Sequence, residues 1–221
     1  MENNEYENAV IIHGTCDEAE YFDPKFPSLS NSHWLPWIQK QLLIRGIETQ
    51  TPEMPVAYFP NYEAWSEELD KYTINGNSTL IGHSCGAGFL LRYLFEKKIS
   101  IAKLILVAPW LDPEKEKDPH FFEFEIDKNL ASKVQQIHLL YSVNDIGSVL
   151  KSVETIKSKI SGLTVKEFKF HGHFTYGEMR TTKFPELLSI CTSKEPRFIK
   201  PQSESLFSNI LTSILNFLKT Q

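Results

Sequence analysis

Short apolar runs alternate along this chain with segments whose apolar residues recur at helical spacing. Six of the runs have the length of strands, and the first of them is continuously apolar, as a strand buried on both faces of a sheet should be. They cover residues 9–12, 47–51, 78–81, 103–108, 137–141 and 163–170. Helical patterns separate most of these runs, which is typical of βα units and a parallel sheet. The sequence therefore predicts a three-layer α/β/α sandwich with about six mostly parallel strands and helices on both faces.

The helical patterns divide into clear and weak segments. Clear ones begin near Trp34, at Tyr62 and at about Cys85, and we expect helices there that end before Gly46, near Tyr72 and near Lys97. Residues 111–133 are aromatic and charged with weak periodicity, which favours either a small lid or a loop insertion. Residues 192–221 form a C-terminal tail in which 203–218 have an apolar helical face. We expect residues 1–221 to form one domain.

Composition excludes several classes of protein. The net charge is −5 and Lys/Arg-rich runs are absent, so we expect no binding to nucleic acid. The sequence has no apolar run of membrane-spanning length, and its first residues are acidic and polar rather than those of a signal peptide. We therefore expect a cytoplasmic protein, either a monomer or a homodimer. No motif for a metal, a phosphate or a dinucleotide is present, so we expect no cofactor and no metal.

Three cysteines occur, Cys16, Cys85 and Cys191, with no Cys-x-x-Cys spacing. An odd and sparse set of this kind is typical of reduced thiols in a cytosol-like compartment.

Gly82, Ser84 and Gly86 form a Gly-x-Ser-x-Gly motif directly after the third predicted strand. Apolar residues such as Leu90 and Leu94 indicate that a helix begins within the motif. In so sharp a turn from strand to helix, the glycines leave room beside a serine whose hydroxyl is held out from the sheet edge. We expect Ser84 to be a nucleophile. The alternative is a tight glycine turn with an inert serine.

Two histidines, His171 and His173, follow the last predicted strand. A histidine in that loop lies where a sheet of this kind brings a general base beside the nucleophile. We expect His173 to take the Ser84 proton and to return it to the leaving group, while His171 is a surface or hydrogen-bonded residue.

The acidic partner of the histidine is expected after the fifth strand, because chain order in α/β-hydrolases runs Ser, Asp or Glu, then His. Asp145 has this position, and Asp112 after the fourth strand is the second candidate. The alternative for Asp145 is a turn or a helix N-cap carboxylate.

Two backbone amides are expected to hold the oxyanion of the reaction. One is the N–H of Cys85, next to the nucleophile, and the other is the N–H of Thr15, or of Gly14, in the loop after the first strand. Aromatic residues near the same edge, Trp34, Tyr58 and Trp110, are candidates for lining a substrate pocket, although each also suits packing of the core or rim.

The chain resembles the small serine hydrolases related to retinoblastoma-binding protein nine, from about Val10 to Cys191. The likeness rests on Ile12-His13-Gly14, His33-Trp34-x-Pro36-Trp37, Pro52-x-Met54-Pro55, Gly82-His83-Ser84-x-Gly86, Gly172-His173-Phe174 and Phe184-Pro185-Glu186-Leu187-Leu188. The resemblance implies a compact six-stranded α/β-hydrolase fold with a Ser-Asp-His triad and little or no lid. It places the nucleophile at Ser84 and the base at His173.

Two features depart from that family. Relatives often carry two adjacent acidic residues after the fifth strand, where this chain has Asn144-Asp145, and the tail from about Thr192 is longer than in typical members. If the acid of the family aligns with Asn144, then either the triad is crippled or Asp145 replaces it.

The function we expect is hydrolysis of a small carboxylic ester or amide through an acyl-enzyme. The alternatives are a binding protein without catalysis on a hydrolase fold, and an acyltransferase or lyase that uses the same three residues.

Overall fold

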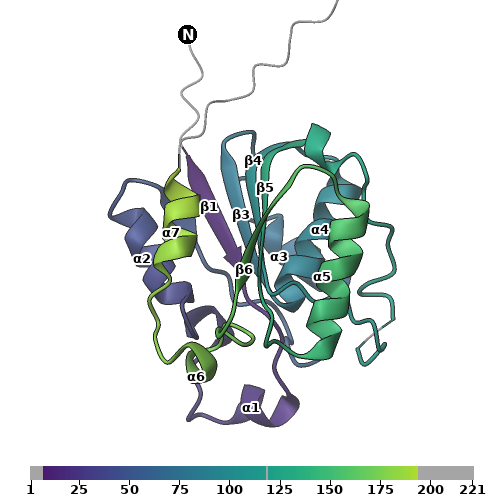
Figure 1. The fold of residues 1–221 in the computed structure, drawn as a ribbon. Coiled ribbons are helices and arrows are strands. Elements are labelled where there is room, and N and C mark those ends of the chain that lie inside the picture. The colour runs from purple at the N-terminus through teal and green to yellow at the C-terminus, as the bar shows by residue number, and fades with distance from the viewer. Residues whose placement is uncertain (1–6, 118, 194–221) are drawn as a thin grey trace, which may run out of the picture.

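The computed structural model describes residues 7–117 and 119–193. Its centre is a sheet of six parallel strands in the order β2-β1-β3-β4-β5-β6 (Figure 1). The strands are β1 (Asn8–Ile12), β2 (Glu48–Gln50), β3 (Ser78–His83), β4 (Ile101–Val107), β5 (Val134–Ser142) and β6 (Leu163–Phe168). The prediction of a six-stranded parallel α/β sheet is confirmed.

Helices cover both faces of this sheet. The described residues form the helices α1 (Glu18–Phe22), α2 (Leu35–Leu43), α3 (Tyr62–Leu69), α4 (Cys85–Lys97), α5 (Gly147–Lys159), α6 (Tyr176–Met179) and α7 (Pro185–Thr192), with two 3-10 turns, η1 (Leu29–Asn31) and η2 (Leu130–Ser132). Helices α2 and α7 lie on one face, and α3, α4 and α5 on the other (Figure 1). This division follows from right-handed crossovers that run toward opposite edges of the sheet.

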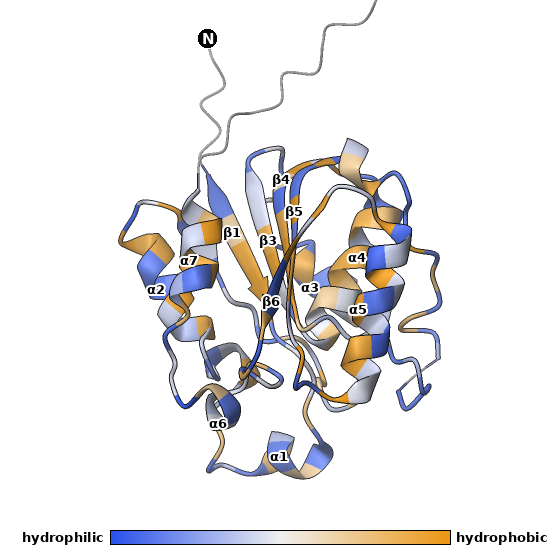
Figure 2. Cartoon of the chain, in the orientation of Figure 1, coloured by the Kyte–Doolittle hydropathy of each residue, from blue (hydrophilic) through white to orange (hydrophobic). Residues whose placement is uncertain are grey.

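The core is built from the rows of apolar side chains that the parallel register aligns. Leu80 of β3 pairs with Val10 on one side and with Leu104 on the other, and Leu104 pairs in turn with Ile137. These four side chains are all at most 2% exposed. The inner strands are accordingly apolar, whereas the edge strand β6 is polar and largely exposed (Figure 2), as an edge that must not pair with other chains requires.

The chain changes direction across the sheet between β1 and β3. After β1 it leads to α2 on one face, and after β3 to α4 on the other. The loops that follow adjacent strands therefore separate at the carboxyl edge of the sheet, where open α/β sheets place their binding sites. His13-Gly14 and Ser84 occupy these two loops.

Several element ends differ from the prediction. Strand β5 begins at Val134, because Val134 pairs with Ile101 and the pairing runs on through the polar Gln136. Strand β6 ends at Phe168, and Phe170 beyond it is 81% exposed. Helix α3 ends at Leu69, short of the expected Tyr72, and the segment between β1 and α2 contains the short helix α1.

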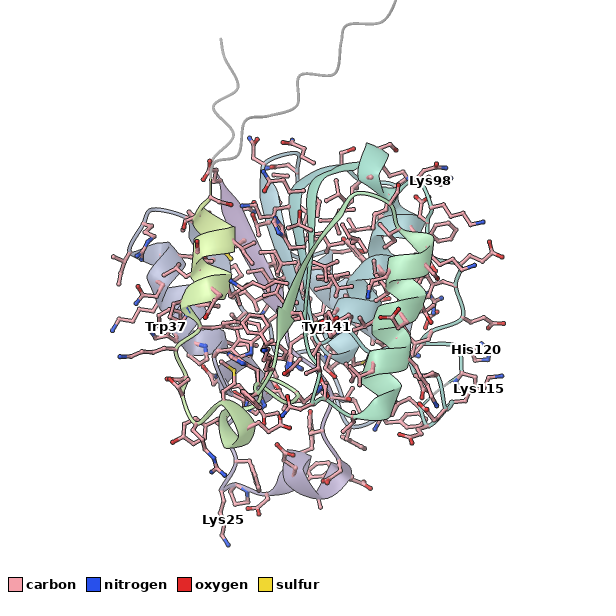
Figure 3. All side chains as sticks on the ribbon, in the orientation of Figure 1. Lys25, Trp37, Lys98, Lys115, His120 and Tyr141 are labelled. Atoms are coloured by element: carbon pink, nitrogen blue, oxygen red, sulfur yellow. The ribbon has the colours of Figure 1, made fainter. Side chains whose placement is uncertain are left out.

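Residues 111–117 and 119–133 form turns and η2 rather than a longer helix. Phe121 is fully buried in this segment, with its ring against those of Trp65 from α3 and Phe89 from α4. Lys115 and His120 of this segment project at the outer side of the molecule (Figure 3). Aromatic packing thus holds the segment against the helical layer.

The helix expected over 203–218 lies outside the described residues. Among the residues that are described, no helix is long and apolar enough to cross a membrane.

Candidate active site

Ser84 lies in the turn between β3 and α4, with backbone angles φ 54° and ψ −122°. Positive φ is rare for a residue with a side chain and marks a turn that its surroundings hold in place. The Ser84 amide donates to the Val107 carbonyl at 2.9 Å, and its carbonyl accepts from the Trp110 amide at 3.1 Å. These bonds tie the serine to the end of β4.

The glycines on either side of Ser84 are required by close approach of the backbone. A methyl group on Gly82 would lie 2.5 Å from Ala87 Cα, and one on Gly86 would lie 2.7 Å from the Ile12 carbonyl oxygen. No larger residue fits without moving a strand or the first turn of α4.

His173 follows β6 and reaches the serine. Its Nε2 lies 2.8 Å from Ser84 Oγ, and its Nδ1 lies 3.1 Å from each carboxylate oxygen of Asp145. Because a carboxylate only accepts, Nδ1 carries the proton, and Nε2 of the neutral ring accepts from the serine hydroxyl. This is the tautomer that a general base for Ser84 needs.

Asp145, rather than Asn144 or Asp112, is the acidic partner that the structure brings to His173. The Asp145 side chain is fully buried, and its Oδ1 also accepts from the Ile146 amide at 2.7 Å. Asp112 instead accepts from the amides of Glu116 and Lys117 at 2.7 and 2.9 Å, which makes it a turn carboxylate.

Asn144 has a different place, beneath the histidine loop. Its Oδ1 accepts from the Ser142 hydroxyl at 2.6 Å and from the Gly172 amide at 3.0 Å. Ser142 is fully buried, and its oxygen accepts from the His171 amide at 3.0 Å. The end of β5 therefore holds the backbone that leads into His173.

Two further residues, neither of which was predicted from the sequence, hold His173. Glu178 accepts from the His173 amide at 2.6 Å, and His83 donates its Nε2–H to the His173 carbonyl at 2.8 Å. Burial lowers the pKa of His83 well below its usual value, and the nearby His173 and His33 lower it further. His83 is thus a neutral donor. Its position beside Ser84 in the motif was the only available signal.

The loop after β1 packs directly against the serine. A methyl group on Gly14 would lie 2.9 Å from Ser84 Cβ and 3.5 Å from Ser84 Oγ. Within the described chain, the amides of Thr15 and Cys85 donate no hydrogen bond to another protein group. Donors without partners beside a nucleophile are what an oxyanion site requires.

His13 holds this loop in place. Its Nδ1–H donates to the Gly14 carbonyl at 2.6 Å, and its Nε2 accepts from the Met54 amide at 2.8 Å. Burial lowers the pKa of His13, and a neutral ring is the form that makes both bonds.

The family described as serine hydrolase matches residues 24–188, more than half of the chain and the part that contains Ser84, Asp145 and His173. The chain belongs to the serine hydrolase family. It is 34% identical over 102 residues to Bacillus subtilis YdeN, a protein provisionally named a hydrolase; the match covers 44% of this chain and 48% of that protein.

Solved structures show the same fold as this serine hydrolase. The crystal structure of the Bacillus subtilis ydeN product has a TM-score of 0.68 at 23% identity and covers 84% of this chain and 97% of that one. Est1E from Butyrivibrio proteoclasticus has a TM-score of 0.56 at 14% identity and covers 86% and 88%. A predicted hydrolase from Thermoplasma acidophilum has a TM-score of 0.54 at 16% identity and covers 85% of each chain. These likenesses establish the α/β-hydrolase fold.

The three aromatic residues that were candidates for lining a substrate pocket in this serine hydrolase differ in how far they are exposed. Trp34 is fully buried against His83 and Phe184, a core position that keeps it from a substrate. Trp110 is 7% exposed and its amide bonds to Ser84, whereas Tyr58 is half-buried against the rings of α1.

His171 is not placed to act as the base, and Cys85 is not placed to act as the nucleophile. His171 packs on Phe168 with ring centroids 4.4 Å apart, and burial lowers its pKa. The Cys85 thiol is fully buried, which raises its pKa, so the thiolate that a sulfur nucleophile requires is disfavoured. Among the described residues, no three His, Cys, Asp or Glu side chains gather as metal ligands.

Proposed function

We propose that this serine hydrolase cleaves a small carboxylic ester or amide through an acyl-enzyme, with Ser84 as nucleophile, His173 as base and Asp145 as its orienting acid. The observation that carries the proposal is the continuous hydrogen-bonded chain from Ser84 Oγ to His173 Nε2 at 2.8 Å and from His173 Nδ1 to Asp145 at 3.1 Å. A serine whose hydroxyl donates to an imidazole base, itself oriented by a carboxylate, is activated for acyl transfer.

The proposed reaction has two halves. Ser84 Oγ attacks the carbonyl carbon while its proton passes to His173 Nε2, and the amides of Cys85 and Thr15 (or Gly14) hold the oxyanion. The C–O or C–N bond then breaks, and the Nε2 proton goes to the departing alcohol or amine. In the second half, His173 takes a proton from water, the hydroxide attacks the acyl-enzyme, and the proton returns to Ser84 as the acid leaves. Asp145 stays ionised and stabilises the imidazolium in both halves.

Two other functions share this site. An acyltransferase would form the same acyl-enzyme and pass it to an alcohol or amine instead of water, and a binding protein would not need an activated serine. The Asp145–His173 contact favours catalysis over binding. Because Asp145 supplies the acid that orients the base, the presence of Asn at position 144 does not leave His173 without an acidic partner.

The test is turnover of p-nitrophenyl acetate by the wild type, Ser84→Ala and Ser158→Ala. Ser158 is exposed on α5 and serves as the matched control. We expect Ser84→Ala to lower kcat by at least about a thousandfold and Ser158→Ala to match the wild type. Equal turnover by Ser84→Ala would remove the proposal.

We propose further that the chain groups within its family with the relatives of retinoblastoma-binding protein nine, on the strength of the His-Trp-x-Pro-Trp and Pro-x-Met-Pro motifs. We propose a cytoplasmic location as well, which the free thiols of Cys16, Cys85 and Cys191 support.

A further inference from the structure

A cavity of about 340 Å³ lies in the segment that follows the loop after β1. Its wall is formed by Cys16, by residues 20–24 of α1 and the turn after it, by residues 26–29, and by Glu53. Helix α1 projects beyond the carboxyl ends of the strands (Figure 1), which is the edge where the Ser84 turn begins.

The cavity is connected to the nucleophile through the loop after β1. Gly14 lies against Ser84, where a methyl group on it would be 3.5 Å from Oγ. Cys16, which lines the cavity, is two residues farther on, and two trans peptide steps span at most about 7.6 Å. The wall of the cavity therefore begins within about 7.6 Å of the glycine that contacts the nucleophile.

Aromatic rings give the cavity its apolar character. Tyr21, Phe22 and Phe26 line it and are 37%, 66% and 52% exposed. Tyr58 supports them, with its ring centroid 4.9 Å from that of Tyr21 and 5.6 Å from that of Phe22. A group of large aromatic rings exposed to solvent side by side is typical of a surface that binds an apolar group.

The charge on the cavity wall is negative, and one carboxylate in it lacks a partner. Glu53 accepts from the Leu29 and Ser30 amides, and Asp23 accepts from the Lys25 amide. Glu20 also lines the cavity, but within the described chain no hydrogen bond or ion pair involves its carboxylate.

The pKa of the Cys16 thiol reflects the negative charge of the cavity wall. Burial, followed by the charges of Glu20, Asp17 and Glu53, raises the pKa of Cys16 to about 11, whereas Lys117 acts in the opposite direction. Lys25 points away from the body of the molecule (Figure 3).

We propose that this cavity is the subsite for a positively charged, apolar arm of the substrate, such as an aliphatic or aromatic amine. The rings bury the apolar part and attract the ammonium group through their faces, and Glu20 supplies the opposite charge. The inference rests on the proposed function, because it assigns an arm of the molecule that is cleaved at Ser84.

The test measures equilibrium binding to the Ser84→Ala protein, so that it does not depend on turnover. Three anilides of equal length serve as probes in calorimetry at pH 7.5: the 6-aminohexanoic, heptanoic and adipic monoanilides, which end in an ammonium, a methyl and a carboxylate group. We expect the ammonium probe to bind at least about fivefold more tightly than the methyl probe and the carboxylate probe to bind least.

Two further substitutions separate the subsite from a general charge effect. Glu20→Gln on the Ser84→Ala background is expected to abolish the preference for the ammonium probe. Glu18→Gln removes the same charge from the same short helix, but Glu18 does not line the cavity, so that variant is expected to keep the preference.

The subsite is refuted if no probe binds, if the methyl or carboxylate probe binds as tightly as the ammonium probe, or if Glu20→Gln leaves the preference intact. These outcomes are distinct from failure of the proposed function, which shows as absence of p-nitrophenyl acetate turnover by the wild type whatever the binding preference of the Ser84→Ala protein.

Discussion

The side-chain oxygen of Asn144 accepts a hydrogen bond from the backbone amide of Gly172 at 3.0 Å, one residue before His173. Asn144 therefore supports the loop that carries the histidine, while its neighbour Asp145 contacts the imidazole. The same oxygen accepts from the Ser142 hydroxyl, so it joins the end of β5 to the histidine loop.

Asn144→Ala is expected to lower kcat/KM about three- to tenfold, because the Gly172 amide loses its acceptor and His173 becomes less well fixed. Asn144→Asp keeps an acceptor oxygen at the same place and is expected to retain most of the activity. Steady-state kinetics on p-nitrophenyl acetate compares the two. An equal loss in both variants would contradict the role of the oxygen as acceptor.

Asp145 and Asp112 are expected to differ sharply when each is changed to Asn. Asp145→Asn removes the acceptor that fixes the His173 tautomer, and we expect kcat to fall by about three to four orders of magnitude. Asp112→Asn affects the turn at Glu116 and Lys117 and is expected to change kcat less than about threefold. The opposite ranking would reassign the acid.

The strained backbone of Ser84 makes a prediction about stability. Glycine adopts positive φ at little cost, so Ser84→Gly is expected to raise the free energy of unfolding by about 1 kcal/mol and Tm by about 2–4 °C. Differential scanning calorimetry checks this against Ser158→Gly in α5, where glycine is expected to lower Tm because it weakens a helix. A Tm for Ser84→Gly at or below that of the wild type would show that the turn is not strained.

His138 is expected to make stability depend on pH. It is 7% exposed, and burial, together with the charge of Lys103, lowers its pKa from 6.5 to about 4. The unfolded chain then binds more protons at this residue between these values. The free energy of unfolding is therefore independent of His138 above about pH 6.5 and decreases as the pH falls toward 4, by up to about 1.4 kcal/mol for each pH unit.

His138→Leu removes this contribution, and the His138 Nε2 has no hydrogen-bond partner to lose among the described residues. Urea unfolding at pH 7.5 and 5.0 is expected to show a smaller difference for His138→Leu than for the wild type. The part that remains comes from other buried histidines such as His83. Identical differences in the two proteins would mean that folding does not change the protonation of His138.

The inner strands of the sheet could be predicted from the sequence because strands buried on both faces are apolar runs. Ser84 was accessible because the close approaches at Gly82 and Gly86 admit only glycine, which leaves a readable motif. The start of β5 could not be predicted, because Gln135 and Gln136 interrupt the apolar pattern although the backbone pairing with β4 extends past them to Val134.

The choice between Asn144 and Asp145 needed three-dimensional structure, because two adjacent residues in a turn point in different directions and sequence does not say which one meets the imidazole. Glu178 and His83 were missed for a related reason. They act on the backbone of His173 across the fold, and such contacts carry no spacing rule along the chain.

Reaction of the serine with a fluorophosphonate tests the central claim most directly. Intact-protein and peptide mass spectrometry would follow labelling of the folded wild type, Ser84→Ala and His173→Ala. We expect one adduct, on Ser84, in the wild type, none in Ser84→Ala, and labelling at least about a hundredfold slower in His173→Ala because the base is lost. A folded wild type that takes no label, or that takes it on another residue, would contradict an activated Ser84.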